Sequence, residues 1–224
     1  METLVVEDLL LLLLDDEKGH IAGEGTLYYT LGGAVLLELA LTGRVRVEPK
    51  KSAFGSSTIQ SVGSIPPTDP ILADAFTVVA KKPRTAQTFI LMLGPSLRTK
   101  VTDRLVERGL VRRNTKKVLG LFRSTTWPAE DTRHEAELRE RIRAILVDGA
   151  EPDPRTGAII ALLDASGQMP LVLKFPGVPA REIAKRVKTV SEGVWAAEAV
   201  KNAILATNAA ITAATTAAVI NTVS

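Results

Sequence analysis

The apolar stretch from Leu27 to Val47, LYYTLGGAVLLELALTGRVRV, constrains the fold more than any other part of this 224-residue chain. Its apolar side chains recur at the spacing of a helix face, at Leu31, Val35, Leu36, Leu39 and Ala40. Leu37 and Leu41 widen that face, so we expect a helix that is buried on most of its surface. The sequence therefore predicts a central helix against which the rest of the chain packs.

The residues within and after this helix refine the prediction. Glu38 is the one charge inside the apolar run, and a buried carboxylate is costly unless it is paired, so we expect a basic or backbone partner for it. Gly43 lies where a helix C-terminus favours a left-handed residue. Arg44 to Val47 then alternates polar and apolar residues, which predicts a short strand. This unit carries no catalytic group.

Length, charge and cysteine content narrow the class of protein. A chain of this length can bury a substantial core, and its net charge of +3 permits an anionic partner without requiring one. The absence of cysteine excludes disulfides and thiolate metal sites and fits a cytoplasmic protein. The leucine run 9–14 is too short to span a bilayer, which takes about 20 apolar residues, and polar residues interrupt the longer stretch 203–220. We therefore expect no membrane span.

The rest of the chain reads mostly as helices separated by glycine and proline. Apolar periodicity predicts helices at 4–14 (with Thr3 as the cap), 71–80 (opened by Pro70), 85–93, 97–108 (capped by Ser96), 131–146, 155–165, 179–190 and from Trp195 onward. A strand is expected at 58–62. A hairpin is expected from strands at 110–111 and 117–122 with a turn at Asn114-Thr115, and the chain leaves this hairpin at Trp127-Pro128. No repeat or domain boundary is evident. The prediction is a mainly α, single helical domain spanning residues 1–224, with a short β-hairpin.

Candidate catalytic groups are sparse. His20 and His134 are the only histidines, and neither has a second ligand at helical or loop spacing. No glycine-rich phosphate loop and no nucleophile elbow is present. We therefore expect no enzymatic activity, no metal and no cofactor, and we expect His134 to be solvated.

The region from Arg98 to Arg123 is rich in basic residues. Lys100, Arg104 and Arg108 follow one another at four-residue spacing and share a helix face. Further cations follow in the predicted hairpin, at Arg112, Arg113, Lys116, Lys117 and Arg123. One interpretation is a solvated face with ion pairs. The other is a platform for anions beside an apolar hairpin, because basic side chains near a bilayer each gain about 1 kcal/mol from anionic lipid.

Several motifs in this order resemble the Golgi phosphoprotein 3 family. They are DDEKG at 15–19 followed by ELALTGRV, LRTKVTDRLVERGLV at 97–111, RTGAIIALLDAS at 155–166, and the EGVW region at 192–195. The resemblance covers nearly the whole chain and suggests a bacterial-type member. It implies the family's helical fold. Eukaryotic members are peripheral membrane proteins that bind phosphatidylinositol 4-phosphate, which makes anionic phospholipid the implied ligand.

The resemblance also implies positions for a headgroup site. Family members hold the lipid phosphate with a Trp and an Arg near the central helix and with two arginines one turn apart in the helix at 97–108. Arg98 matches one of that pair, while the other falls on Pro95 or Val101. The central-helix Arg falls on Gly32. The Trp falls near Gly23, where Tyr28 or Tyr29 is the nearest substitute.

These observations lead to a functional hypothesis and two alternatives. We expect a cytoplasmic, peripherally membrane-associated protein. Its phosphoinositide-like headgroup would contact Arg98, Lys100, Arg104 and Tyr28, and its hairpin would touch the membrane through Lys117, Leu119, Leu121 and Phe122. The position of Arg98 just after Ser96 predicts a helix N-terminus that favours an anion. The hairpin is also a candidate for homo-oligomer contacts. The alternatives are a protein-interaction adaptor without lipid binding and, ranked last, a winged-helix-like nucleic-acid-binding module.

Overall fold

The computed structural model describes residues 2–48, 58–118, 122–192 and 194. Its helices are α1 (Val5–Leu13), α2 (Leu27–Leu41), α3 (Pro70–Lys81), α4 (Ala86–Glu107), α5 (Arg133–Leu146), α6 (Pro154–Ala165), α7 (Met169–Val172) and α8 (Ala180–Ser191). The strands are β1 (Val45–Glu48), β2 (Thr58–Ser61), β3 (Asn114–Val118) and β4 (Phe122–Thr126), in two antiparallel pairs. The predicted mainly helical fold is confirmed. The helix expected from Trp195 onward lies outside the described residues.

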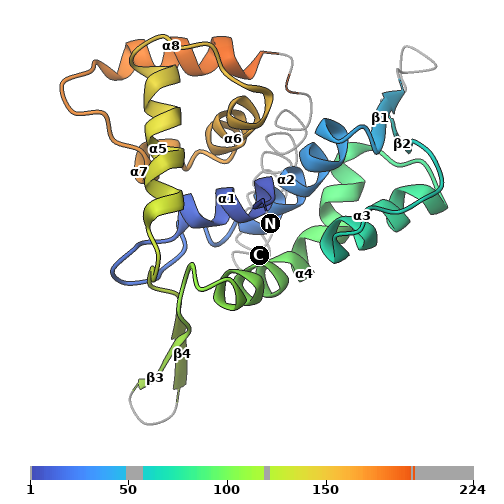
Figure 1. Cartoon of the computed structure of the whole chain (residues 1–224), viewed down its shortest axis with the longest axis horizontal. Coiled ribbons are helices and arrows are strands. Elements are labelled where there is room, and N and C mark those ends of the chain that lie inside the picture. Colours follow the sequence, from blue (N-terminus) through green and yellow to red (C-terminus); the bar gives the residue numbers. More distant parts are fainter. Residues whose placement is uncertain (1, 49–57, 119–121, 193, 195–224) are drawn as a thin grey trace, which may run out of the picture.

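Helix α2 lies at the centre of the molecule and packs against α1, α3, α4 and α6 (Figure 1). Leu31, Val35, Leu36 and Leu39 are fully buried, as their spacing predicts, whereas Ala40 of the same predicted face is only partly buried. Leu41 is an exception, with 42% of its surface exposed, because it lies in the last turn where the helix leaves the core. The close packing of α2 on α4 depends on small residues, since a Cβ atom added to Gly32 would lie only 3.0 Å from the Ile90 carbonyl oxygen.

Helix α1 is buried along its whole length, including its two carboxylates. The prediction that Thr3 caps this helix is wrong. Leu4 occupies the cap position, and the Glu7 carboxylate accepts a hydrogen bond from the Leu4 N–H at 2.9 Å. The leucine run therefore forms a core helix.

Aspartates begin two of the other helices. The Asp69 carboxylate accepts hydrogen bonds from the N–H groups of Ile71 and Leu72, and the predicted opening of α3 at Pro70 is confirmed. Asp153 caps α6 in the same way, again just before a proline. An aspartate cap with proline in the first turn satisfies free N–H groups and presets the backbone, so both starts are fixed locally.

Helix α4 is continuous where two helices were expected. Gly94 and Pro95 lie inside it, so the predicted stop at that point and the predicted cap at Ser96 are both wrong. Instead, the Ser96 hydroxyl donates to the Leu93 carbonyl within the same helix. Packing against α2 outweighs the local preference for a break, because Leu93, Gly94 and Leu97 on one side of the helix are buried in the core.

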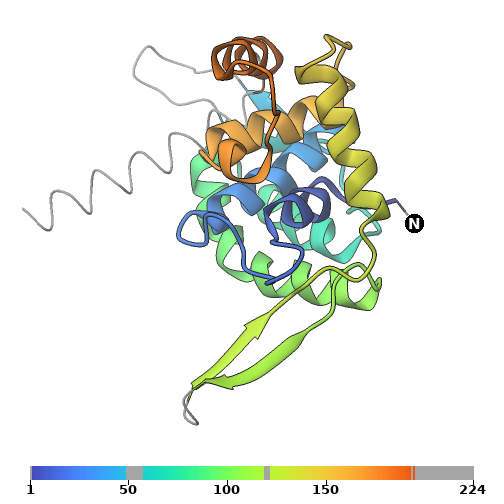
Figure 2. The ribbon, with the colours of Figure 1, turned by 90° about the vertical axis from the view of Figure 1, so that its left-hand side faces the viewer.

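The two strand pairs lie at different places on the helical body. Strand β1 follows the left-handed Gly43 (φ 67°), as predicted, and pairs with β2 from Val45 opposite Ser61 to Glu48 opposite Thr58. The pair of β3 and β4 projects away from the helices in both views (Figures 1 and 2). None of the helices within the described ranges is long and apolar enough to cross a membrane.

Candidate functional site

Arg98 is a partly exposed residue of α4. Its Nη2 pairs with Glu24 Oε1 at 2.5 Å, and its Cζ lies 5.5 Å from the ring centroid of Trp127. The Arg98 and Glu24 side chains are 41% and 59% exposed, so solvent screens this ion pair strongly. We refer to Arg98, Glu24 and Trp127 as the Arg98 cluster. Because α4 is continuous, Arg98 is not at a helix N-terminus, and anion binding here depends on its side chain alone.

Tyr28 lies at the same crossing of α2 and α4. A Cβ atom added to Gly94 would come within 2.2 Å of the Tyr28 carbonyl oxygen, so the two backbones nearly touch. Arg98 follows Gly94 by one helical turn and is therefore on the same side of α4. The Tyr28 ring lies 3.9 Å from that of Tyr29, between centroids. The structure thus brings two of the predicted headgroup residues, Arg98 and Tyr28, to one region.

Trp127 also belongs to this region. From the sequence it was expected only to mark where the chain leaves the hairpin. Its indole Nε1 is buried and has no hydrogen-bond partner among the described residues. Its backbone packs against Gly19, where any Cβ would come within 2.4 Å of the Trp127 nitrogen. The one signal in the sequence was an aromatic residue close to a run of cations, a combination that favours cation–π contacts.

The other predicted headgroup cations connect α4 to its neighbours. Arg104 Nη1 pairs with Asp69 Oδ2 at 2.6 Å, and the Arg104 side chain is only 15% exposed. Lys100 pairs with Asp74 of α3 at 2.6 Å and is more open to solvent. Arg108 lies 3.0 Å from Glu7. Burial raises the pKa of Glu7, and the positive charges of Arg108 and Arg104 oppose that shift. Arg104 therefore has two carboxylate neighbours that Arg98 does not share, the partly buried Asp69 and, at 3.8 Å, the fully buried Glu7.

The β3–β4 pair differs from the predicted hairpin in register. Its ladder runs from Asn114 opposite Thr126 to Val118 opposite Phe122, so Asn114 begins a strand and is not the turn. Threonines at both positions of the Thr115–Thr125 pair favour extended backbone, which explains why pairing extends this far from the tip. The predicted strand at 110–111 is reduced to one bridge, between Val111 and Ala129.

This register divides the predicted membrane-contacting residues between the two strands. Lys117 lies opposite Arg123 in the ladder, and Val118 opposite Phe122. Leu119 and Leu121 lie outside the described residues. The ladder thus sets two cations opposite each other, with an apolar pair one step nearer the tip.

Comparison with known proteins identifies the family. The sequence of Golgi phosphoprotein 3 (GPP34) proteins matches residues 5–207, which include all the helices and strands described above. The chain belongs to the Golgi phosphoprotein 3 family. Vacuolar protein sorting-associated protein 74 of Eremothecium gossypii is 26% identical over 162 residues, and that of Schizosaccharomyces pombe is 24% identical over 161. These alignments cover 64% and 63% of this chain but 49% and 48% of the relatives, so the chain matches about half of their length.

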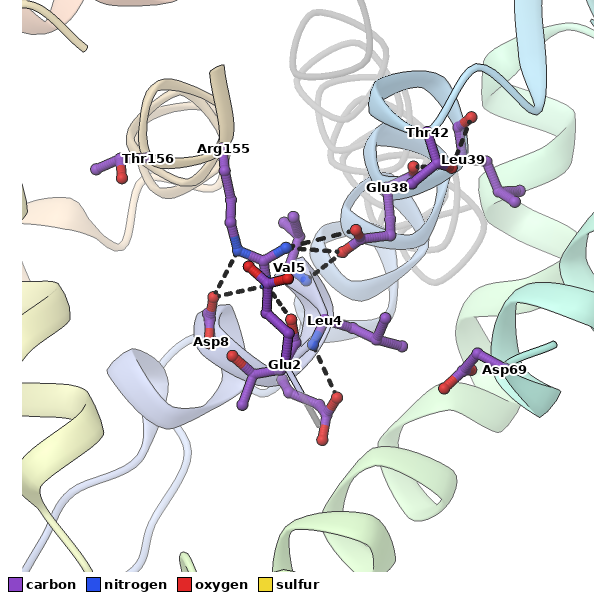
Figure 3. Close-up of polar contacts among 12 residues, drawn as sticks. Glu2, Leu4, Val5, Asp8, Glu38, Leu39, Thr42, Asp69, Arg155 and Thr156 are labelled. Carbon is purple, nitrogen blue, oxygen red and sulfur yellow. Dashed lines mark hydrogen bonds and ion pairs between the residues drawn. The ribbon is translucent and has the colours of Figure 1, made fainter. Parts of the chain in front are cut away.

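A buried charge network holds this family member together near its N-terminus (Figure 3). Arg155 extends from the start of α6 to Asp8 of α1, at 2.8 Å, and to Glu38 of α2, at 3.3 Å. Glu38 also accepts the Val5 N–H at 2.5 Å, so its predicted pairing with basic and backbone groups is confirmed. The Arg155 guanidinium also donates to the Thr3 carbonyl. One arginine thus joins three helices through two carboxylates that are almost fully buried.

His134 is part of the same network, and its predicted solvation is wrong. Its Nε2 lies 2.7 Å from Asp8 Oδ1 and 3.2 Å from the Thr3 hydroxyl, and its side chain is 29% exposed. The reason is that α5 packs against α1, which turns this position toward Asp8. Within the part of the chain that the structure describes, no three His, Cys, Asp or Glu side chains are grouped so as to hold a metal ion.

Proposed function

We propose that this Golgi phosphoprotein 3 family member is a peripheral membrane protein that binds anionic phospholipid through the end of the molecule that carries β3 and β4. The observation that supports this most directly is the projecting strand pair, with Lys117 opposite Arg123 and Val118 opposite Phe122 (Figure 2). In a peripheral protein, basic groups lie at the headgroup level while apolar residues enter the boundary below. The order of residues along this ladder fits that arrangement.

The charge pattern of the ladder favours an anionic partner. Like charges on directly opposed residues of an antiparallel pair are destabilising. A surface of acidic lipid would offset that repulsion and would add about 1 kcal/mol for each basic residue near it. The electrostatic energy of Lys117 and Arg123 is therefore more favourable beside an acidic bilayer than in water.

Within this proposal, Arg98 binds a lipid phosphate. Its ion pair with Glu24 is exposed and weak, so a phosphate can replace the Glu24 carboxylate. An arginine fork can donate two parallel hydrogen bonds to a phosphate. Tyr28 lines the same crossing, and the more exposed Lys100 adds positive charge nearby. Arg104 contributes little, because Asp69 and Glu7 already neutralise it.

The relatives support a role at a membrane. Their names refer to vacuolar protein sorting, and the family's name refers to the Golgi; both are processes or places of membrane traffic. By this analogy the chain acts at a cytoplasmic membrane surface. A nucleic-acid role is less favoured, because Arg104 and Arg108 of α4 are mostly buried in ion pairs with Asp69 and Glu7 and are not open to a phosphate backbone.

Co-sedimentation with vesicles tests the proposal. Neutral vesicles are compared with vesicles that contain phosphatidylserine or phosphatidylinositol 4-phosphate, for wild type, Arg98→Ala and Phe122→Ser. We expect binding to acidic vesicles only, and weaker binding by both variants. Equal binding to neutral and acidic vesicles would contradict the proposal. An Arg98→Ala protein that binds like wild type would remove the headgroup role of Arg98.

A further inference from the structure

An apolar groove of about 450 Å³ lies between the end of α6 and α8. The side chains that give it its apolar character are Met169, Leu173, Phe175, Val178, Ile183 and Val187. Its volume is in the range of pockets that bind small molecules or side chains of a partner. None of these residues belongs to the Arg98 cluster or to the buried charge network.

The α8 wall of this groove is fixed in place. Val187 is buried in the core, and Arg186 donates hydrogen bonds to the carbonyl of Ile145 in the last turn of α5 and to those of Gly149 and Ala150 after it. These contacts hold α8 against α5 and the turn that follows it. Ala180, Ile183, Ala184 and Val187 line the groove at the spacing of one helix face.

Cations lie beside the groove. Lys174 lines it, and Arg181 and Lys188 lie one turn from Ala184 at its edge. All three are exposed, and none of them forms an ion pair within the described ranges. Asp164 is the one acidic residue among the residues that line the groove. An occupant with an apolar face and negative charge on either side would complement this surface.

We propose that this groove binds an acidic amphipathic helix of a partner protein. Such a helix would place apolar side chains three and four residues apart into the groove, the usual mode for a helix bound in a groove. Its acidic residues would face Lys174, Arg181 and Lys188. The choice of a protein over a lipid rests on the proposed function, because α8 and the β3–β4 pair lie at opposite ends of the molecule in both views (Figures 1 and 2).

A synthetic peptide tests this proposal on the full chain in solution, without vesicles. The peptide is a fluorescent helix of about 14 residues, roughly four turns, with leucines on one face and glutamates elsewhere. A second peptide replaces the glutamates with lysines, and a third replaces the leucines with serines. Fluorescence anisotropy should show saturable binding of the first peptide, at least about ten-fold tighter than that of either control. Because no membrane is present, this result does not depend on lipid binding.

Two variants on α8 form a matched pair. Lys188→Glu reverses a charge at the edge of the groove, whereas Lys185→Glu reverses one roughly 150° around the helix from its centre. At about 0.1 M salt, we expect Lys188→Glu to weaken peptide binding about five-fold or more, because its charge lies beside the bound peptide. Lys185→Glu should change the affinity by less than about two-fold. Ala184→Arg fills the groove while adding positive charge, and it should abolish binding. Thermal unfolding of each variant checks that it is folded.

Several results would overturn the proposal. These are an absence of saturable binding to wild type, equal binding of the acidic and basic peptides, or an equal effect of Lys185→Glu and Lys188→Glu. A dimer that Ala184→Arg disrupts would assign the groove to a second copy of the chain. Vesicle binding that Ala184→Arg weakens would assign it to a lipid chain. A photo-crosslink from position 184 to residues after Val194 would assign it to the chain's own C-terminal segment.

Discussion

Single residues show where sequence reasoning reaches its limit. The need for a partner at Glu38 follows from one rule, that a charge in an apolar run must be paired. Its partner Arg155 lies 117 residues away in the sequence, so no local pattern could name it. Trp127 and Glu24 beside Arg98 were missed for the same reason, since three separate segments supply this cluster.

The burial of α2 gives a prediction with a matched control. Leu39 is fully buried, whereas Leu41, two residues later, is 42% exposed. We expect Leu39→Ala to lower the free energy of unfolding by about 2–5 kcal/mol, because it leaves a cavity in a packed core. Leu41→Ala should change it by less than about 1 kcal/mol. Urea denaturation measures both, and equal losses would contradict the central position of α2.

Glu135 gives the protein a stability that depends on pH. Burial raises the pKa of Glu135 from 4.5 to about 7, Arg139 opposes this shift, and Asp16 adds to it. The folded state therefore holds this proton to a higher pH than the unfolded chain does. The associated stability is full below about pH 4.5 and is lost as the pH rises to about 7, a change on the order of 1–3 kcal/mol.

Denaturation at pH 5 and pH 8 measures this effect. We expect Glu135→Gln to lose less stability between the two values than wild type does, because glutamine does not titrate. The exposed Glu137→Gln, on the same helix, is the control and should follow wild type. If Glu135→Gln and wild type lose the same stability, the pKa of Glu135 is not raised.

At the scale of elements, local sequence signals predict where a helix starts. They predict less well whether a helix continues and which residues of two strands pair. Pro70 marks the start of α3 correctly, because an aspartate cap and a proline act within one turn. Gly94-Pro95 predicts a break that does not occur, because α4 is held by packing against α2. The hairpin register failed in a similar way, since Asn114 suits a turn but is paired with Thr126.

Two helical glycines, one at the crossing of α2 and α4 and one on α6, predict opposite effects of substitution by alanine. Gly94→Ala would place its Cβ 2.2 Å from the Tyr28 carbonyl oxygen, so the helices must separate, at a cost of about 1–3 kcal/mol. Gly157→Ala on α6 meets only ordinary contacts at 3.6 and 3.7 Å and should gain roughly 0.5–1 kcal/mol from reduced chain entropy. Thermal unfolding compares them. A neutral Gly94→Ala would show that the helices do not cross this closely.

The whole molecule has two ends with different surfaces. The projecting β3–β4 pair is at one end and α8 is at the other, with the core around α2 between them (Figure 1). Composition and periodicity predicted the helical class, and the order of motifs predicted the family. Neither could predict which cations stay accessible, because that depends on carboxylates from other helices. Arg104 and Lys100 lie on one predicted face, yet they differ in exposure for this reason.

The most direct measurement is acidic-vesicle binding after charge reversal at the projecting end. The double variant Lys117→Glu/Arg123→Glu is compared with Arg46→Glu/Arg143→Glu, which makes the same charge change at exposed positions on β1 and near the far end of α5. With about 1 kcal/mol for each basic residue near the surface, the first variant should bind at least about ten-fold more weakly than wild type. The second should stay within about three-fold, since both variants have the same net charge. Equal losses in the two variants would contradict a membrane-binding face at β3 and β4.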